Sequence, residues 1–87
     1  MNVIPTSRFR FSLKKLPIAL VEKVVERTLL FKKNPFDPLL QTHKLHGKLK
    51  NKWSFSVDNR FRVVFEFNKL NRSEVIFLDI GDHDLYR

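Results

Sequence analysis

The spacing of hydrophobic residues divides the chain into a helical first half and a strand-forming second half. Phe9, Leu13 and Leu16 are four and three residues apart, which predicts one apolar stripe of a short helix. The segment from Ile18 to Lys33 predicts a second helix, since it ends at two lysines followed by an Asn-Pro pair. The expected buried stripe of this second helix comprises Ile18, Val21, Val24, Val25, Thr28 and Leu29.

Three segments of the second half predict β-strands, and in the first two of them apolar residues alternate with other residues. These strands occupy residues 53–57, 61–67 and 74–80. Trp53 alternates in phase with the other apolar residues of its strand, so we interpret it as a core residue rather than as a surface on which bases stack. The third strand is expected to end before Gly81, where the chain leaves the sheet.

The apolar faces of these strands also predict their register. A three-residue connection at positions 58–60, with residue 59 or 60 in the left-handed conformation, pairs Phe55 with Val63. The same connection places Ser56 beside Arg62. The expected polar face of the sheet carries Ser54, Ser56, Arg62 and Asp79, the last two as a cross-strand pair.

The order of the elements predicts the fold class. Asn2 to Pro5 is a short apolar segment typical of an edge strand, because a proline cannot donate to a sheet. The resulting order is β-α-α-β-β-β, an α+β fold in which an antiparallel sheet carries a two-helix hairpin on one face. Residues 1–87 are expected to form a single domain, since so short a chain has no room for a second core.

The charge of the chain favours a polyanionic partner. Seventeen Lys and Arg residues against nine Asp and Glu residues give a net charge of +8 and a pI near 10.2. Such a balance on a small domain indicates RNA, DNA or an acidic protein. The absence of cysteine excludes disulfides and thiol chemistry. No segment has the pattern of a membrane span or a signal peptide, so we expect a cytoplasmic protein without a membrane partner.

Positive charge is densest in the segment HKLHGKLKNK, which begins at His43 and precedes the first strand of the second half. The expected RNA-binding residues are Lys44, Lys48, Lys50 and Lys52 of this segment and Arg60 after it. His43 and His46 are three residues apart, as in some metal sites, but no third ligand accompanies them. We therefore expect neither a metal ion nor another cofactor.

Histidine and arginine also suit the cleavage of RNA without a metal. One group deprotonates the ribose 2′-OH, a cation stabilises the phosphate, and an acid protonates the 5′-oxygen. Arg62 lies in the second strand of the predicted meander, and His83 follows the third. Simpler interpretations stand beside this one: Arg62 as the cross-strand partner of Asp79, and His83 as a surface histidine between two aspartates.

Two segments of the chain, HKLHGKLKNKWSFSVDNRFRVVFEF and VIFLDIGDHDLYR, resemble the RelE/ParE superfamily of bacterial type II toxins, especially its RelE and YafQ-like branch. The similarity covers nearly the whole chain and rests on the order and spacing of several short motifs. The resemblance implies the toxin fold and a ribosome-dependent endoribonuclease, an mRNA interferase, which cuts mRNA in the ribosomal A site. It also implies a cognate antitoxin that holds the toxin inactive in a hetero-oligomer.

The same resemblance implies roles for individual residues. Arg62 corresponds to the transition-state arginine of the family, and His83 to the position of an arginine or histidine that acts as general acid. Tyr86 lies near the position of a C-terminal aromatic residue. His43 corresponds to the histidine before L-x-G in the YafQ-like branch.

Some positions depart from the family pattern. RelE proteins carry two lysines on the strand where this chain has Ser54 and Ser56, so the base is either His43 or His46. The YafQ-like branch has an aspartate near the hairpin, for which Asp58 is the nearest candidate. ParE proteins share the fold, inhibit DNA gyrase and lack the nuclease residues, which makes gyrase inhibition the alternative function. An inactive toxin fold that only binds an antitoxin is a third possibility.

Overall fold

The structure is a computed structural model that describes residues 1–82. The helices and strands in this part of the chain follow the predicted order, with a very short additional strand and two 3₁₀ turns, η1 and η2, before the hairpin. In chain order the elements are β1 (Asn2–Pro5), α1 (Ser7–Lys14), α2 (Ile18–Lys33), η1 (Pro38–Leu40), β2 (His43–Lys44), η2 (Gly47–Leu49), β3 (Trp53–Ser56), β4 (Phe61–Phe67) and β5 (Glu74–Asp82).

Within residues 1–82 the strands form one sheet in the order β1-β5-β4-β3-β2. The strands β3, β4 and β5 make the predicted antiparallel meander. The first strand, however, pairs with β5 in the parallel direction, with Asn2 opposite Glu74. The sheet is therefore mixed, and the expectation of a purely antiparallel sheet is wrong at this edge. A parallel pair needs a long connection, and the helices and the meander between β1 and β5 provide it.

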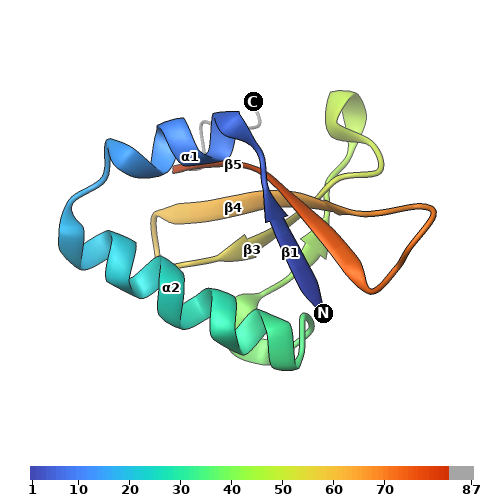
Figure 1. Ribbon diagram of the computed structural model, residues 1–87, viewed down its shortest axis with the longest axis horizontal. Helices are drawn as coiled ribbons and strands as arrows, with labels where there is room; N and C mark the ends of the chain where they lie inside the picture. Colours follow the sequence, from blue (N-terminus) through green and yellow to red (C-terminus); the bar gives the residue numbers. More distant parts are fainter. Residues whose placement is uncertain (83–87) are drawn as a thin grey trace.

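Both helices pack on the same face of the sheet, as predicted (Figure 1). Thr6 is the N-cap of the first helix, and its hydroxyl accepts a hydrogen bond of 3.1 Å from the Phe9 N–H. The second helix has the predicted bounds and ends at two lysines, which suit the negative end of the helix dipole. In the described part of the chain no helix is both long and apolar enough to cross a membrane.

The buried face of α2 differs from the expected one. Val24 and Phe31 are buried, whereas Ile18, Val25 and Leu29 are 74%, 54% and 58% exposed. The helix is thus turned so that its aromatic residue reaches the sheet. A phenylalanine side chain buries more apolar area than a valine or isoleucine does, so Phe31 determines the orientation of the helix.

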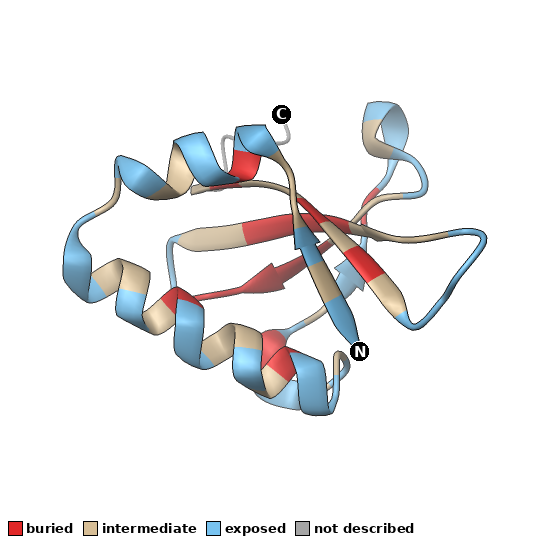
Figure 2. Ribbon diagram, viewed as in Figure 1, coloured by how far each residue is buried: buried red, intermediate tan, exposed pale blue. Residues whose placement is uncertain are grey.

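Phe31 forms the centre of an aromatic core between α2 and the sheet. The centroid of its ring lies 4.9 Å from those of Phe55 and Phe65 and 5.7 Å from that of Phe77. Figure 2 shows the buried positions gathered on the central strands and on the inner sides of the helices. Trp53 stacks on Phe65 with centroids 6.5 Å apart, so it belongs to this core, as predicted.

The hairpin between β3 and β4 has the predicted register, with Ser56 opposite Arg62. The expected left-handed residue at 59 or 60 is absent. Instead, the carboxylate of Asp58 accepts hydrogen bonds from the N–H groups of Arg60 and Phe61, at 2.8 and 2.7 Å. An aspartate that bonds the backbone ahead of it closes the turn without a positive φ angle.

The predicted cross-strand pair of Arg62 and Asp79 is wrong, because Arg62 lies opposite Gly81. An irregularity in the pairing of β4 with β5 adds one residue to β5 and shifts its alternation. As a result, Phe77 and Ile80, which have opposite parity in the sequence, are both buried.

The carboxylate of Asp79 contacts α1, while its backbone pairs with Val64 of β4. Arg8 Nε and Ser12 Oγ donate hydrogen bonds to its carboxylate at 3.3 and 2.6 Å. The strand also continues to Asp82, beyond its predicted end. Asp79 therefore holds α1 on the sheet, and the guanidinium of Arg62 is not its partner.

Candidate active site

A chain of hydrogen bonds orients Arg62 on the sheet face that points away from the helices. Arg62 Nη1 donates to Ser56 Oγ, and Ser56 Oγ donates to Gln41 Oε1 at 3.1 Å. Gln41 lies beside Ser56 because β2 pairs His43 with Ser54, and the same spacing continues two residues further. Three separate segments therefore determine the direction of the guanidinium.

His43 lies on β2 at the other end of this network. Its Nδ1 is 3.0 Å from the backbone carbonyl oxygen of Gln41. A carbonyl oxygen only accepts hydrogen bonds, so this contact needs the proton on Nδ1, and the neutral ring then carries its lone pair on Nε2. Because the side chain is exposed, Nε2 is accessible to a substrate proton. This arrangement favours His43 as a general base.

Gln41 is the residue of this site that sequence reasoning missed. It follows η1 in the left-handed conformation, with a φ of 49°. Its backbone carbonyl reaches His43 while its side chain reaches Ser56. The signal that identifies it is the pairing of β2 with β3, and a strand of two residues is too short to predict from its pattern.

The two serines that replace the lysines of RelE proteins are buried. Ser54 and Ser56 are 0% and 6% exposed, and Arg62 is half-buried. The sheet face is therefore covered near the serines. A partly buried guanidinium interacts with a phosphate more strongly than an exposed one, because less water screens the two charges.

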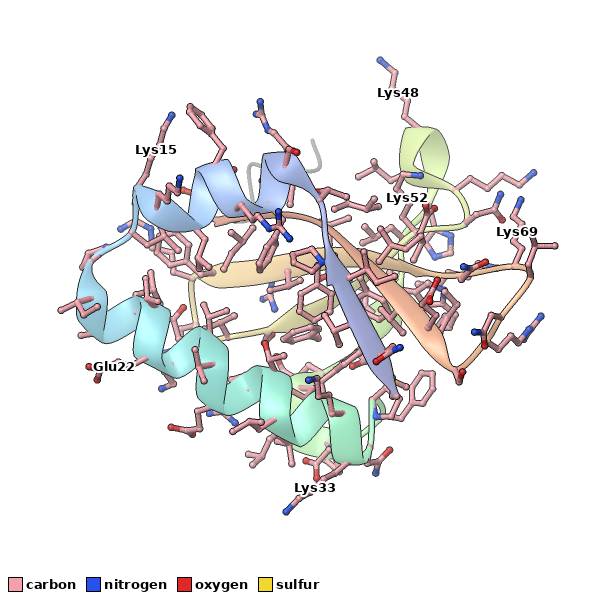
Figure 3. All side chains as sticks on the ribbon, viewed as in Figure 1. Lys15, Glu22, Lys33, Lys48, Lys52 and Lys69 are labelled. Carbon is pink, nitrogen blue, oxygen red and sulfur yellow. The ribbon has the colours of Figure 1, made fainter. Side chains whose placement is uncertain are left out.

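The basic residues expected to bind RNA divide into free and paired groups. Lys44, Lys48 and Lys50 are exposed and form no ion pair with another described residue. Lys52 Nζ lies 3.4 Å from the carboxylate of Glu66, and Arg60 lies 3.8 Å from that of Asp82. Figure 3 shows Lys48 and Lys52 at the end of the molecule away from the connection between the helices. The exposed lysines are thus the stronger candidates for contacts with phosphates.

The other candidate catalytic residues either have no hydrogen-bonded connection to Arg62 or lie outside the described residues. His46 is exposed before η2, and no hydrogen bond of the described residues joins it to Arg62. His83 and Tyr86 fall outside the described residues. Within residues 1–82, no group of three or more potential ligands is arranged to hold a metal ion.

Asp58, the counterpart considered for the aspartate of the YafQ-like branch, lies in the hairpin connection. Partial burial by itself raises the pKa of its carboxyl group. Hydrogen bonds from the Phe61 and Arg60 N–H groups, with the charges of Lys23 and Arg60, outweigh this effect and hold the pKa below its usual range. Asp58 is therefore ionised at neutral pH and stabilises the turn.

Comparisons with solved structures identify this fold among toxins of the RelE, YoeB and YafQ kind. The chain has the fold of these toxins, which confirms the fold that the resemblance implied. No protein-family model and no curated protein matches the sequence.

Three of the similar structures show how complete the match is. The YoeB/ParE toxin from Agrobacterium tumefaciens has a TM-score of 0.78 and 19% identity, over 95% of this chain and 99% of the toxin. A chain of the RelBE2 toxin–antitoxin complex from Mycobacterium tuberculosis has a TM-score of 0.77 and 20% identity, over 94% of this chain and 96% of that chain. YafQ from E. coli strain BL21(DE3) has a TM-score of 0.76 and 15% identity, over 99% of this chain and 98% of YafQ.

Proposed function

We propose that the protein is the toxin of a type II toxin–antitoxin system and acts as a ribosome-dependent endoribonuclease on mRNA. The observation that carries this proposal is the hydrogen-bonded connection from His43 through Gln41 and Ser56 to Arg62. It brings a base with an available lone pair and an oriented cation into one site, on a fold shared with RelE and YafQ toxins.

The proposed reaction uses the chain's own side chains and no metal. His43 Nε2 removes the proton of a ribose 2′-OH, whose oxygen attacks the neighbouring phosphorus. Arg62 stabilises the added negative charge on the phosphate oxygens. The bond to the 5′-oxygen breaks, and an acid protonates that leaving oxygen. We assign this role to His83, and Tyr86 to contact with the substrate near it.

Each group has an expected contribution to the rate. A positioned acid or base typically contributes a factor of about 10²–10⁴. Removal of one donor that stabilises the transition-state charge costs a factor of about 10²–10³. The fold alone does not supply these factors, so the activity depends on the four named side chains.

The proposed partners follow from charge and from the similar structures. The ribosome and mRNA are polyanions that match a protein of net charge +8. Two similar structures are described as complexes of a toxin with an antitoxin, RelBE2 and YoeB-YefM from Staphylococcus aureus. We propose a cognate antitoxin for this chain as well, bound as a hetero-oligomer in the cytoplasm.

The test is cleavage of a labelled mRNA in a purified translation system with and without ribosomes. The wild type should cut the mRNA only when it is translated. Arg62→Ala, His43→Ala and His83→Ala should each reduce the rate by at least about 10²-fold. Lys33→Ala is the control, since this exposed lysine lies at the end of α2, on the helical face of the sheet.

A second assay separates the alternatives. If the wild type leaves translated mRNA intact but stops supercoiling by DNA gyrase, the protein is a ParE-like inhibitor. If it does neither, and its synthesis does not arrest growth, it is an inactive relative that only binds an antitoxin. Either result overturns the nuclease proposal.

A further inference from the structure

A polar cavity lies at the edge of the sheet between α2 and the β3–β4 hairpin, beyond the end of the short strand β2. Its volume is about 230 Å³, below the roughly 300–1,000 Å³ of pockets for drug-sized ligands. The polar residues that line it are Lys23, Arg27, Gln41, Ser56, Asp58 and Asn59. Gln41 and Asn59 are exposed, so the cavity reaches the surface.

Two cations of the cavity come from one face of α2. Lys23 and Arg27 are four residues apart, one helical turn, and both are half-buried. Neither is among the ion pairs of the described residues. The carboxylate of Asp58, which interacts with Lys23, is already bonded to two backbone N–H groups. The residues that line the cavity thus carry two positive charges and one negative charge, so one positive charge of the lining is uncompensated.

Arg27 also has an unused hydrogen-bond donor. Its Nε is buried and has no partner among the described residues. Buried polar groups nearly always have a hydrogen-bond partner, so an exception calls for a specific explanation. An anion in the cavity would supply the missing negative charge and an acceptor for the guanidinium of Arg27, whose side chain lines the cavity. Arginine with a phosphate oxygen is one of the strongest pairings of this kind.

The cavity is continuous with the candidate active site. Ser56 lines the cavity and accepts the hydrogen bond from Arg62, and Gln41 lines the cavity and accepts the bond from Ser56. A ligand in the cavity therefore lies one hydrogen-bonded side chain away from the proposed catalytic arginine. Consecutive phosphates of one RNA strand are suited to occupy two such neighbouring cationic positions.

We propose that Lys23 and Arg27 bind a backbone phosphate of the RNA strand, next to the phosphate that Arg62 contacts. This inference rests on the proposed RNA substrate. The single uncompensated charge matches the single charge of a phosphodiester, and the small volume matches a phosphate rather than a base. The site positions the strand and takes no part in bond breaking.

The direct test uses the wild-type protein and a short 2′-O-methyl RNA, which has no 2′-OH to attack. On addition of this RNA, the ¹⁵N–¹H resonance of Arg27 Nε should shift in a saturable way. No saturable shift with the RNA would overturn the proposal. A shift with an acidic peptide but not with the RNA would equally overturn it, because the occupant would then be a protein carboxylate.

Matched variants give a second measurement. Lys23→Gln and Arg27→Gln should each weaken binding of the same RNA several-fold and lower the slope of log K against log salt by about 0.7. Lys33→Gln removes an exposed charge from the same helix and should have a smaller effect on affinity. Equal losses for all three folded variants would contradict the proposal.

These readouts are independent of cleavage. If translated mRNA is cut but Arg27 does not respond to RNA, the phosphate site is wrong and the nuclease proposal stands. If Arg27 responds but no mRNA is cut, the binding site stands and the nuclease proposal fails.

Discussion

At the scale of single residues, Gln41 connects the two halves of the candidate site. Its carbonyl orients His43 and its amide oxygen accepts from Ser56, which in turn accepts from Arg62. A side chain that orients a catalytic group through another residue affects turnover more than substrate affinity. Gln41 is therefore a positioning residue, and its side chain should matter even though it is exposed.

We predict that Gln41→Asn reduces kcat about fivefold while KM changes little, because the shorter side chain loses a hydrogen bond worth about 1 kcal/mol. Asparagine tolerates the left-handed conformation at this position, so the thermal midpoint should fall by no more than the loss of this one hydrogen bond explains. The measurement is single-turnover cleavage of translated mRNA together with thermal unfolding. A loss of activity that follows a loss of stability would argue against a positioning role.

The two histidines of the basic segment differ in their hydrogen bonds to this network. His43 has its Nδ1 proton fixed by a carbonyl, whereas His46 has no hydrogen bond to this network within the described residues. We predict that His43→Gln lowers the cleavage rate by about 10²–10⁴. His46→Gln should change the rate by less than about threefold. The reverse ranking would transfer the base role to His46.

Asp58 makes stability depend on pH. Its pKa is lower in the folded protein than in the unfolded chain, so its ionised form stabilises the fold at pH values above the unfolded pKa of about 3.9. That contribution is lost as the pH falls through the folded pKa. We predict that the wild type is more stable than Asp58→Asn at neutral pH, and that the two converge in acid. Urea unfolding of the two proteins at neutral and at acidic pH checks this prediction. A difference in the free energy of unfolding that does not change with pH would contradict it.

At the scale of secondary structure, α2 shows that its bounds and its orientation have different origins. Its start is set locally by Pro17, and its end by the two lysines of its last turn and by Pro35 after it. Its rotation is set by Phe31, which contacts three aromatic rings on different strands. The exposed residues Val25 and Leu29 belong to the same apolar helix but do not reach the core.

We predict that Phe31→Ala costs about 3–5 kcal/mol of the free energy of unfolding, since it removes a buried ring from the centre of the core. Leu29→Ala, two residues away on the exposed side, should cost less than about 0.5 kcal/mol. Urea denaturation of both variants measures the difference. Similar losses for the two would mean that α2 packs through the stripe inferred from the sequence.

The strands show the same limit of sequence reasoning. The register of the β3–β4 hairpin was predictable because apolar residues occupy alternate positions on both sides of the turn and only the four residues 57–60 separate the strands. The register of β5 was not, because its bulge changes which residues face the core, and a bulge has no signature in alternation. Arg62 was therefore identified correctly on the polar face, but with the wrong partner.

The site required more than strand register. Gln41 lies in an irregular segment after η1, and its role depends on the pairing of a two-residue strand with β3. Arg27 lies outside the buried stripe predicted for the second helix, yet its Nε is buried. Both residues are functional candidates because of contacts between distant segments, which a pattern within one segment does not contain.

At the scale of the whole molecule, one group of lysines lies at the end of the molecule away from the connection between the helices (Figure 3). Figure 3 shows Lys48, Lys52 and Lys69 at one end, with Lys15 and Lys33 distributed around the helices. Charged surfaces that face one way steer a polyanion toward that side, an effect that weakens as salt rises. If the protein acts on the ribosome as we propose, the exposed lysines at this end should make the first contacts with its RNA.

This distribution predicts a difference between two triple variants of equal charge. Replacing Lys44, Lys48 and Lys50 by alanine leaves +5 of the net charge of +8, and so does replacing Lys14, Lys15 and Lys33. If direction matters, the first variant should bind ribosomes at least about tenfold more weakly than the second and show a slope against log salt that is smaller by about 2, or 0.7 for each lost contact. Ribosome affinity measured over a range of salt concentrations checks this. Equal affinities would mean that binding responds only to net charge, and the basic segment would then have no special role in docking.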